Sequence, residues 1–180
     1  MTHPGVEAAT RLAISYAEKH GVLRSFDPNL RPPLWKDLED AKQAIRYGLA
    51  HCDVLKISDN EIQWLTGEED FTAGVNALRA EFDIPLILVS MGPDGSRAYT
   101  KELMVEVPAR LNPNTVATTG AGETFCACVL HDVLENGVET FTKERLENML
   151  NLVNAAASIV TTRRGALRVM PTPEEIEATL

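Results

Sequence analysis

Cysteine is scarce in this sequence: Cys52, Cys126 and Cys128 are the three among 180 residues. Their number is odd. Cys126 and Cys128 stand two positions apart, so on a helix they would point to different faces. A disulfide framework and a shared cysteine metal site are therefore poor explanations of the fold. We expect three buried thiols in a reducing cytoplasm.

Long apolar runs and an excess of positive charge are also missing. No apolar run reaches the length of a membrane-spanning helix, and residues 1–5 do not resemble a signal peptide. The 17 lysines and arginines are outnumbered by 26 acidic residues, which gives a net charge of −9. Nucleic acids and anionic membranes attract basic surfaces, so we expect neither as a partner. A cytoplasmic location is the expectation that remains.

The composition is that of a globular protein, with 44% hydrophobic and 24% charged residues. Helical and extended patterns alternate along the chain. The helical patterns cover residues 6–20, 37–50, 59–65, 71–81, 120–134 and 143–160, and the strand patterns cover 22–26, 54–57 and 85–90, with a two-strand ribbon at 96–100 and 104–107. This alternation predicts one domain over residues 1–180, an α/β sandwich with a largely parallel sheet.

A glycine-rich stretch at residues 118–125 is the most informative local feature. Gly120 and Gly122 allow a ligand to approach the backbone, and a long apolar helix begins directly after them. The unpaired amides and the dipole of a helix start favour bound anions such as phosphate. Glu123 could then take a proton from an attacking hydroxyl. The alternative is an ordinary glycine-rich helix start with an acidic first turn.

Polar residues follow three of the predicted strands. Because ligands of parallel sheets bind beyond the carboxyl ends of the strands, these residues are candidates for one site. They are Asp27, Asn29 and Arg31 after the first strand, Lys56, Ser58 and Glu61 at the second, and Ser90 and Gly92 at the third. Arginine suits phosphate, and a carboxylate suits Mg²⁺ or its waters. Each residue also has an ordinary alternative: a turn for Asp27 and Asn29, a surface ion pair for Arg31, and a solvated first helical turn for Glu61.

Four segments together resemble the pfkB (ribokinase-like) family of carbohydrate kinases, and within it the fructokinases. Residues 25–35 are similar to a D-P-N-x-R-x-x-L-W segment, and residues 56–61 to a K-x-S/N-x-x-E stretch. Residues 90–95 resemble a G-x-x-G turn, and residues 117–125 resemble the D-T-T-G-A-G-D-x-F signature. The resemblance covers residues 7–173, nearly the whole chain.

This resemblance implies a three-layer ribokinase-like sandwich in which residues 1–180 form the carboxyl-terminal, nucleotide-binding part. It implies transfer of the γ-phosphoryl group of ATP, with Mg²⁺, to a sugar hydroxyl, fructose being favoured. Gly120, Ala121 and Gly122 would form the anion hole, and Glu123 would be the general base. Ser90, Gly92, Gly95 and Asn154 would border the nucleotide, Asp27, Asn29 and Arg31 would lie near the substrate or its phosphate, and Glu61 would act on Mg²⁺ through water.

The sequence departs from the family pattern at two aspartates. Glu123 stands where the family has aspartate, and the extra methylene moves the carboxylate by ~1.5 Å. Ala117 replaces the leading aspartate that helps to bind a monovalent cation in the family, and alanine offers no oxygen. The resemblance therefore makes a K⁺ site doubtful.

Family members are longer, and the part with the sugar-binding residues and early strands is missing before Met1. We therefore expect an unpaired sheet edge with exposed apolar surface, and so self-association or pairing with a missing amino-terminal half. Two kinds of function remain open. The chain is a sugar kinase, or it is a nucleotide-binding fragment or interaction module without turnover.

Overall fold

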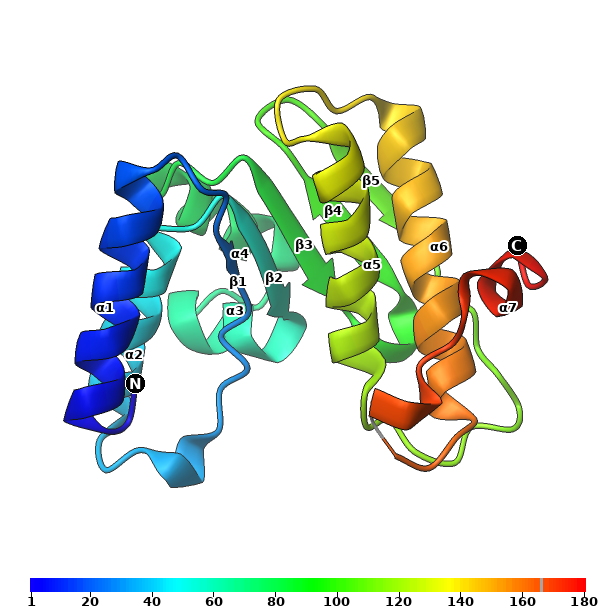
Figure 1. The fold of residues 1–180 in the computed structure, drawn as a ribbon, viewed down its shortest axis with the longest axis horizontal. Helices are drawn as coiled ribbons and strands as arrows, with labels where there is room; N and C mark the ends of the chain where they lie inside the picture. Colours follow the sequence, from blue (N-terminus) through cyan, green and yellow to red (C-terminus); the bar gives the residue numbers. More distant parts are fainter. Residues whose placement is uncertain (166) are drawn as a thin grey trace. The chain divides into compact units, whose positions relative to one another are not determined.

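The computed structural model describes residues 1–165 and 167–180 and divides into two compact units, Met1–Ile87 and Leu88–Leu180. The first unit contains α1 (Pro4–Lys19), β1 (Ser25–Phe26), α2 (Leu38–Leu49), β2 (Val54–Ser58), α3 (Asp59–Thr66) and α4 (Phe71–Glu81) (Figure 1). The boundary falls within β3 (Leu86–Ser90). The second unit continues with β4 (Ser96–Tyr99), β5 (Met104–Val107), α5 (Ala121–Asn136), α6 (Lys143–Thr161) and α7 (Pro173–Glu177). Short 3₁₀ turns are η1 (Pro32–Leu34), η2 (Gly92–Asp94) and η3 (Leu167–Val169).

The strands form a mixed sheet in the order β1-β2-β3-β4-β5. β1 pairs in parallel with β2, so that Ser25 is opposite Val54, and α2 provides the crossover that parallel neighbours need. β4 and β5 pair antiparallel, with Ser96 opposite Val107. The predicted α/β class and the predicted two-strand ribbon are confirmed.

Most predicted elements appear close to their expected bounds, but β1 is shorter than the predicted strand at residues 22–26. The reason is the side chain of Asp53. Its Oδ2 accepts from the backbone nitrogen of Arg24 at 2.7 Å, and the Arg24 carbonyl accepts from the nitrogens of Asp53 and Val54. These bonds hold the residues before Ser25 in place, but they do not form the regular hydrogen-bond ladder of a β-strand. Helix α7 was not predicted; it begins with a capping box between Thr172 and Glu175.

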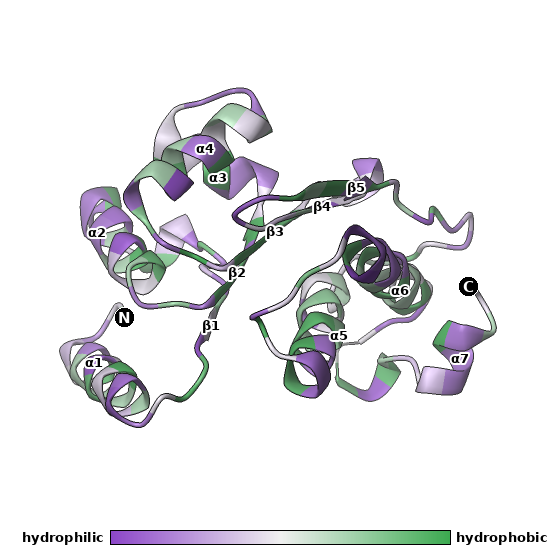
Figure 2. Cartoon of the chain, turned by 90° about the horizontal axis from the view of Figure 1, so that it is seen from above, coloured by the Kyte–Doolittle hydropathy of each residue, from purple (hydrophilic) through white to green (hydrophobic). Residues whose placement is uncertain are grey.

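The hydrophobic core of the first unit includes β2 and the helices before and after it. Leu55 and Ile57 of β2 are fully buried, as are Ala41 of α2 and Ile62 of α3. Helices α3 and α4 lie side by side (Figure 2). In the second unit α5 packs along α6, and α6 also contacts both strands of the ribbon. Leu146, Leu150, Val153 and Ala156 of α6 are fully buried.

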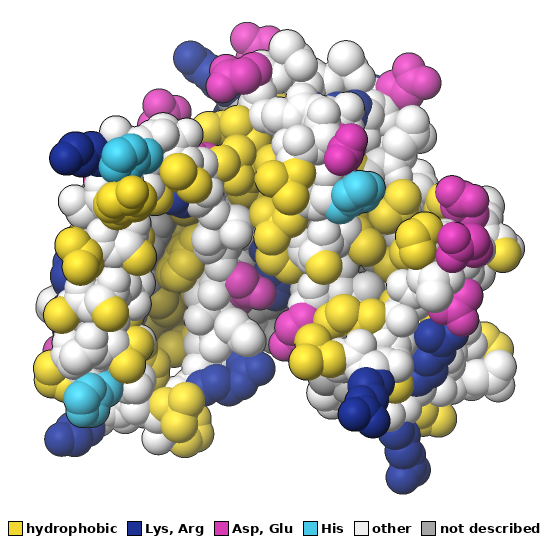
Figure 3. All heavy atoms as spheres, in the orientation of Figure 1, with side chains coloured by type: hydrophobic (Ala, Val, Ile, Leu, Met, Phe, Trp, Pro, Cys, Tyr) yellow, Lys and Arg dark blue, Asp and Glu magenta, His cyan; other side chains and the backbone are white. Residues whose placement is uncertain are grey.

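Helix α1 differs from these helices because none of its residues is buried. The side chains turned most toward solvent include Leu12 and Tyr16, which are 72% and 64% exposed. Figure 3 shows hydrophobic side chains along the outer surface of this helix. An amphipathic helix normally buries its apolar face, so α1 leaves in solvent a surface that would ordinarily be covered.

Cys52 is buried as predicted, whereas Cys126 and Cys128 are half-buried, and all three thiols are free. Burial raises the pKa of the Cys52 thiol to about 12, which makes it a poor nucleophile. Within residues 1–165 and 167–180, no helix combines the length and apolarity needed to cross a bilayer.

Glycine at position 48 is required by packing. A Cβ there would overlap the ring of Phe26, whereas at Gly5 in α1 it would lie at an ordinary 3.5 Å from the Nδ1 of His3. We expect Gly48→Ala to lower the free energy of unfolding by about 2 kcal/mol despite the better helix propensity of alanine. Gly5→Ala should be neutral or stabilising by up to about 1 kcal/mol. Urea unfolding of both variants measures this, and equal values for the two would contradict the packing argument.

Candidate functional site

A charged cluster lies where β1 and β2 end in the first unit. The Nζ of Lys56, in β2, donates to the Oδ2 of Asp27 at 3.1 Å. Lys56 is 8% exposed, which is unusual for lysine and is made possible by this ion pair. The prediction that Asp27 only organises a turn is therefore incomplete, because its carboxylate also neutralises a buried ammonium group.

The second oxygen of Asp27 has no partner. Oδ1 is buried and accepts no hydrogen bond from the described residues. Burial raises the pKa of Asp27, while the charge of Lys56 opposes this rise and the nearby charge of Glu61 adds to it. A buried acceptor without a donor is uncommon and costs free energy. The Oδ1 of Asp27 is thus available to accept a hydrogen bond.

Glu61 ties the loop after β1 to the start of α3. Its Oε2 accepts from the backbone nitrogen and the hydroxyl of Ser58 at 3.0 and 2.8 Å, which completes a capping box. Its Oε1 accepts from the backbone nitrogen of Leu30 at 2.6 Å. The alternative of a merely solvated first-turn carboxylate is wrong, since both oxygens are engaged. A lone pair remains on Oε1, enough to accept from one water.

Asn29 and Arg31 lie in the loop that Glu61 holds. Asn29 has a φ of 44°, a left-handed conformation that asparagine tolerates better than most residues. Among the described residues, the Arg31 guanidinium donates only to carbonyl oxygens of its own loop, those of Leu30 at 3.2 Å and Asn29 at 3.5 Å. The alternative of a surface ion pair is wrong, and the charge of Arg31 has no anionic partner in the described chain.

In the second unit, Ser90, Gly92 and Gly95 surround the tight turn between β3 and β4. The turn closes through the nitrogen of Met91, which donates to the carbonyl of Gly95 at 2.9 Å. Gly95 has a φ of 110°, and a Cβ there would overlap the Val107 carbonyl and lie 2.7 Å from the Ala109 nitrogen. Only glycine fits this position, because both the conformation and the space exclude a side chain.

Asn154 of α6 lies against the same ribbon. Its Oδ1 accepts from the hydroxyl of Ser96 at 2.9 Å, and its Nδ2 donates to the carbonyls of Val107 and Pro108 at 3.3 and 3.2 Å. The structure therefore brings Asn154 and Gly95 together at the end of β5. The two amide hydrogens of Asn154 are both used within the protein, so its side chain joins α6 to the ribbon.

The glycine-rich stretch forms the start of α5. Gly120 is the N-cap residue with a φ of 87°, and no side chain caps the helix. The nitrogen of Ala121 donates to Thr118, and that of Thr124 donates to Gly120. No group in the described chain accepts from the nitrogens of Gly122 and Glu123. Two adjacent amides at a helix start are thus available to an anion.

Two side chains in the first turn of α5 are also unpaired. Glu123 is exposed, and its carboxylate forms no hydrogen bond or ion pair with the described residues. The hydroxyl of Thr124 is buried and lacks a partner. The ordinary alternative, a glycine-rich helix start with an acidic first turn, has this same geometry, so the anion site stays a prediction.

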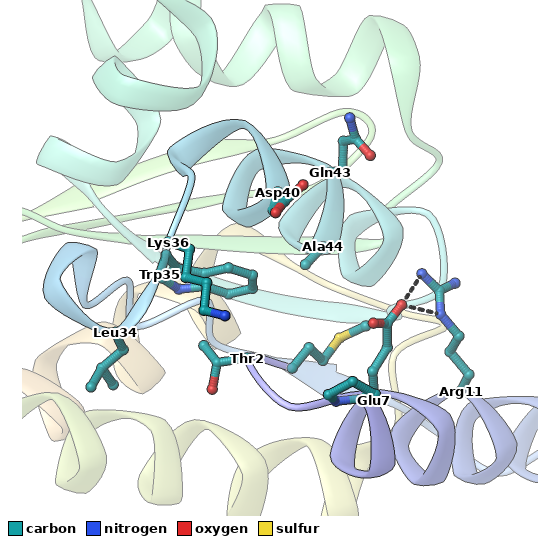
Figure 4. Close-up of a pocket in the computed structure, with 11 residues that line it drawn as sticks. Thr2, Glu7, Arg11, Leu34, Trp35, Lys36, Asp40, Gln43 and Ala44 are labelled. Atoms are coloured by element: carbon teal, nitrogen blue, oxygen red, sulfur yellow. Dashed lines mark hydrogen bonds and ion pairs between the residues drawn. The ribbon is translucent and has the colours of Figure 1, made fainter.

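A separate cavity of about 450 Å³ lies in the first unit, lined by residues of α1, η1 and α2 (Figure 4). Trp35 and Lys36 face it from the segment after η1, and Glu7 forms an ion pair with Arg11 at its wall. None of the residues predicted for the site is among those that line it. This cavity therefore does not extend the predicted site.

Two residues of these clusters were missed or left without a role. Lys56 stood at the predicted strand end, but its charge partner is 29 positions away, and nothing local indicates the pairing. Thr124 stands in the apolar helix that begins after the glycines, and nothing in the sequence indicates that its hydroxyl lacks a partner. Within the described residues, no group of three or more His, Cys, Asp or Glu side chains could hold a metal ion.

Comparison with known proteins gives one consistent result. Residues 3–173 match the model of the pfkB family carbohydrate kinases. The chain is 34% identical over 168 residues to Fructokinase-2 of Solanum lycopersicum, covering 93% of this chain and 51% of that protein. It is 36% identical over 166 residues to Fructokinase-2 of Zea mays, covering 92% of this chain and 49% of that protein. The chain thus spans about half the length of these relatives.

A solved structure shows the same likeness. A fructokinase from Vibrio cholerae O395, crystallised with fructose, ADP and calcium ion, matches with a TM-score of 0.83 and 27% identity, covering 95% of this chain and 55% of that one. The ribokinase-like α/β fold class expected from the sequence is confirmed by this likeness.

The turn before β4 provides a matched pair of variants. We expect Gly95→Ala to lower the free energy of unfolding by on the order of 3 kcal/mol, because the methyl group meets fixed backbone atoms. Gly92 has a φ of 55° with open space around it, so Gly92→Ala should cost only about 1 kcal/mol. Thermal and urea unfolding measure both values. A smaller effect at Gly95 than at Gly92 would show that the turn has another conformation.

Lys56→Met should destabilise the protein by on the order of 3 kcal/mol near neutral pH, because it leaves the buried carboxylate of Asp27 without its cation. Without Lys56 the pKa of Asp27 rises further above its unfolded value. A carboxyl group whose pKa is higher in the folded than in the unfolded state stabilises the folded state at pH values below its unfolded pKa. This stabilisation is lost as the pH rises through the folded pKa.

The stability deficit of Lys56→Met should therefore be largest at about pH 7 and shrink toward about pH 4. The double variant with Asp27→Asn should recover most of the loss at neutral pH. Urea unfolding at several pH values measures this. A deficit that does not change with pH would mean that the pair has no electrostatic role.

Proposed function

Because the chain belongs to the pfkB family of carbohydrate kinases, we propose that it binds ATP and takes part in transferring the γ-phosphoryl group to a sugar hydroxyl. Fructose is the favoured sugar, since the relatives it matches are named fructokinases. The similar fructokinase structure from Vibrio cholerae O395 contains fructose and ADP, which supports fructose as the sugar and ATP as the phosphoryl donor.

The observation that carries this proposal is the open start of α5. The nitrogens of Gly122 and Glu123 have no acceptor in the described chain, and no side chain caps the helix at Gly120. Phosphoryl transfer needs positioned donors that stabilise charge on the equatorial oxygens, and backbone amides provide this without reorganisation. Gly120, Ala121 and Gly122 are the proposed anion hole; the nitrogen of Gly122 is a free donor in it, whereas that of Ala121 donates to the carbonyl of Thr118.

Glu123 is the proposed general base. Its carboxylate has no cationic partner in the described chain, so it is free to accept the proton of the sugar hydroxyl as that oxygen attacks phosphorus. Its side chain is one methylene longer than the aspartate of the family pattern. The carboxylate therefore has to fold back by ~1.5 Å to reach the same position.

Mg²⁺ would be held mainly by the nucleotide phosphates and water, because the described residues offer no three-ligand group. The Oε1 of Glu61 keeps one lone pair after its bond with Leu30, which fits a role through a metal-bound water. A bound Mg²⁺ would neutralise charge on the transferring phosphoryl group.

The remaining predicted residues keep their proposed roles with one refinement. Ser90, Gly92 and Gly95 would border the nucleotide. Asn154 would do so by holding the ribbon, since its own amide group is already bonded to Ser96, Val107 and Pro108. Asp27, Asn29 and Arg31 would contact the substrate or its phosphate, and the Arg31 guanidinium, which lacks an anionic partner in the described chain, suits a phosphate oxygen.

The second candidate function is nucleotide binding without phosphoryl transfer. Glu123 in place of aspartate favours it, since misplacing a base by about 1 Å can cost a factor on the order of a hundred in rate. The chain also spans about half the length of its relatives. We further propose that it self-associates or pairs with a second polypeptide. The exposed residues of α1 and the short edge strand β1 support this.

We propose a cytoplasmic location, because a reducing compartment suits the three free thiols of the chain.

Variants of Glu123 separate the two candidates. If the chain is a kinase, Glu123→Gln should lower ADP release with fructose by about a hundredfold or more and leave ATP affinity within about twofold. Glu123→Asp should raise the rate, by up to about a hundredfold if carboxylate position limits it. Coupled ADP release and calorimetry with ATP measure these effects.

Glu135→Gln, an exposed carboxylate near the other end of α5, is the matched control and should change neither value. ATP binding without turnover in the unmodified chain supports the second candidate. Turnover that survives Glu123→Gln at full rate removes Glu123 from the mechanism. Absence of ATP binding contradicts both candidates.

A further inference from the structure

The segment before Gly120 lacks the carboxylate that the family pattern offers to a monovalent cation. The family pattern places an aspartate at position 117, where this chain has alanine, and residues 111–122 contain no aspartate or glutamate. Potassium is bound by clusters of oxygen atoms, so the donor set has to come from carbonyls and hydroxyls if a site exists. The geometry of those groups therefore decides whether K⁺ fits.

The carbonyl of Thr161, at the end of α6, is the backbone acceptor that holds this segment. It accepts from the nitrogen of Val116 at 2.9 Å and from that of Ala117 at 3.1 Å. A carbonyl oxygen has two lone pairs, so both are used by these two bonds. The bonds also suit the negative end of the helix dipole, which favours donors at the last carbonyls of a helix. This oxygen has no further lone pair for a cation.

Two hydroxyls nearby donate to backbone carbonyls. The Thr115 hydroxyl donates to the carbonyl of Asn112 at 2.8 Å, and that of Thr161 donates to Ser158 at 2.7 Å. The two hydroxyl oxygens lie 3.1 Å apart, and because each hydroxyl has one hydrogen, a bond between them would replace one of these two carbonyl bonds. These bonds attach residues 115–117 to the end of α6 through groups that belong to the protein itself.

One of the three glutamates that follow α6 is occupied as well. Glu175 pairs with the guanidinium of Arg163 at 2.5 Å and accepts from the backbone nitrogen of Thr172 at 2.9 Å. Its charge is therefore balanced within the protein. No carboxylate of the segment itself is present to balance a bound K⁺.

We infer that the anion site at the start of α5 works without K⁺, and that the bonds of Thr115, Val116 and Ala117 with Thr161 hold the loop that a cation would otherwise hold. The inference rests on the proposed function for the anion site. The residues present do not fit the cation, because the carboxylate is missing and the carbonyl is already saturated. Thr115 is accordingly a positioning residue, since it acts on the amides of Gly122 and Glu123 only through the loop.

The first experiment needs no nucleotide. The unfolding temperature of the full chain is measured in chlorides of K⁺, Na⁺ and tetramethylammonium at equal ionic strength. A ligand that binds the native state raises this temperature by mass action, so equal temperatures in the three salts are expected. A rise specific to K⁺ that grows with its concentration would overturn the inference. Because no ATP is present, this result stands even if the proposed function fails.

The second experiment tests the hydrogen bonds that hold the loop. Thr115→Val removes one hydroxyl and should weaken ATP binding about fivefold in calorimetry, the size expected for one neutral hydrogen bond. Thr10→Val removes a comparable hydroxyl bond to the Val6 carbonyl in α1 and should leave ATP binding unchanged. ATP affinity of the unmodified chain should be the same in K⁺ and tetramethylammonium.

Three outcomes are distinguishable. Equal affinity in both salts together with a loss in Thr115→Val supports the inference. An affinity at least fivefold higher in K⁺, or a Thr115→Val variant that binds like the unmodified chain, overturns it. No binding in any salt refutes the proposed function, while the nucleotide-free unfolding comparison still decides whether K⁺ binds.

Discussion

The left-handed turn at Gly120 decides how α5 begins. With a φ of 87° it directs the chain into the helix without a capping side chain, and the amides of Gly122 and Glu123 consequently lack acceptors. Unpaired donors of this kind cost free energy unless water or a ligand bonds to them. The rest of the second unit holds the turn in place. The carbonyl of Thr161 holds the preceding loop.

The opposite end of α5 is fixed just as firmly. The guanidinium of Arg145 bonds to Asp132 in α5 and to the carbonyls of Gly137 and Thr140, so it organises the connection to α6. The guanidinium also stacks on the ring of Phe141, 4.4 Å from its centroid. A helix held at its far end and packed along α6 keeps its first turn in one position. Preorganised donors are worth more to an anion than mobile ones, because they need no rearrangement.

The first unit uses charge in a different way. Asp27 and Lys56 neutralise each other in a buried position, and Glu61 uses its carboxylate to hold both the cap of α3 and the nitrogen of Leu30. The result is a loop whose backbone is fixed while the guanidinium of Arg31 is left without an anionic partner in the described chain.

Local sequence determined the elements of this protein, and also the identities of the residues that set its chemistry. Periodicity predicted α4 with its observed bounds, and the glycines at 120 and 122 indicated an open helix start. Glu123 and Ala117 are departures from the family pattern in the sequence itself. Tertiary structure alone decided which groups meet: Asp27 with Lys56, Asn154 with Ser96, and Thr161 with Val116 and Ala117. It also shortened β1 and left α1 without a buried face. The physical reason is that helix and strand preferences act over a few neighbouring residues, whereas these bonds join groups 29 to 58 positions apart and form only when the core packs.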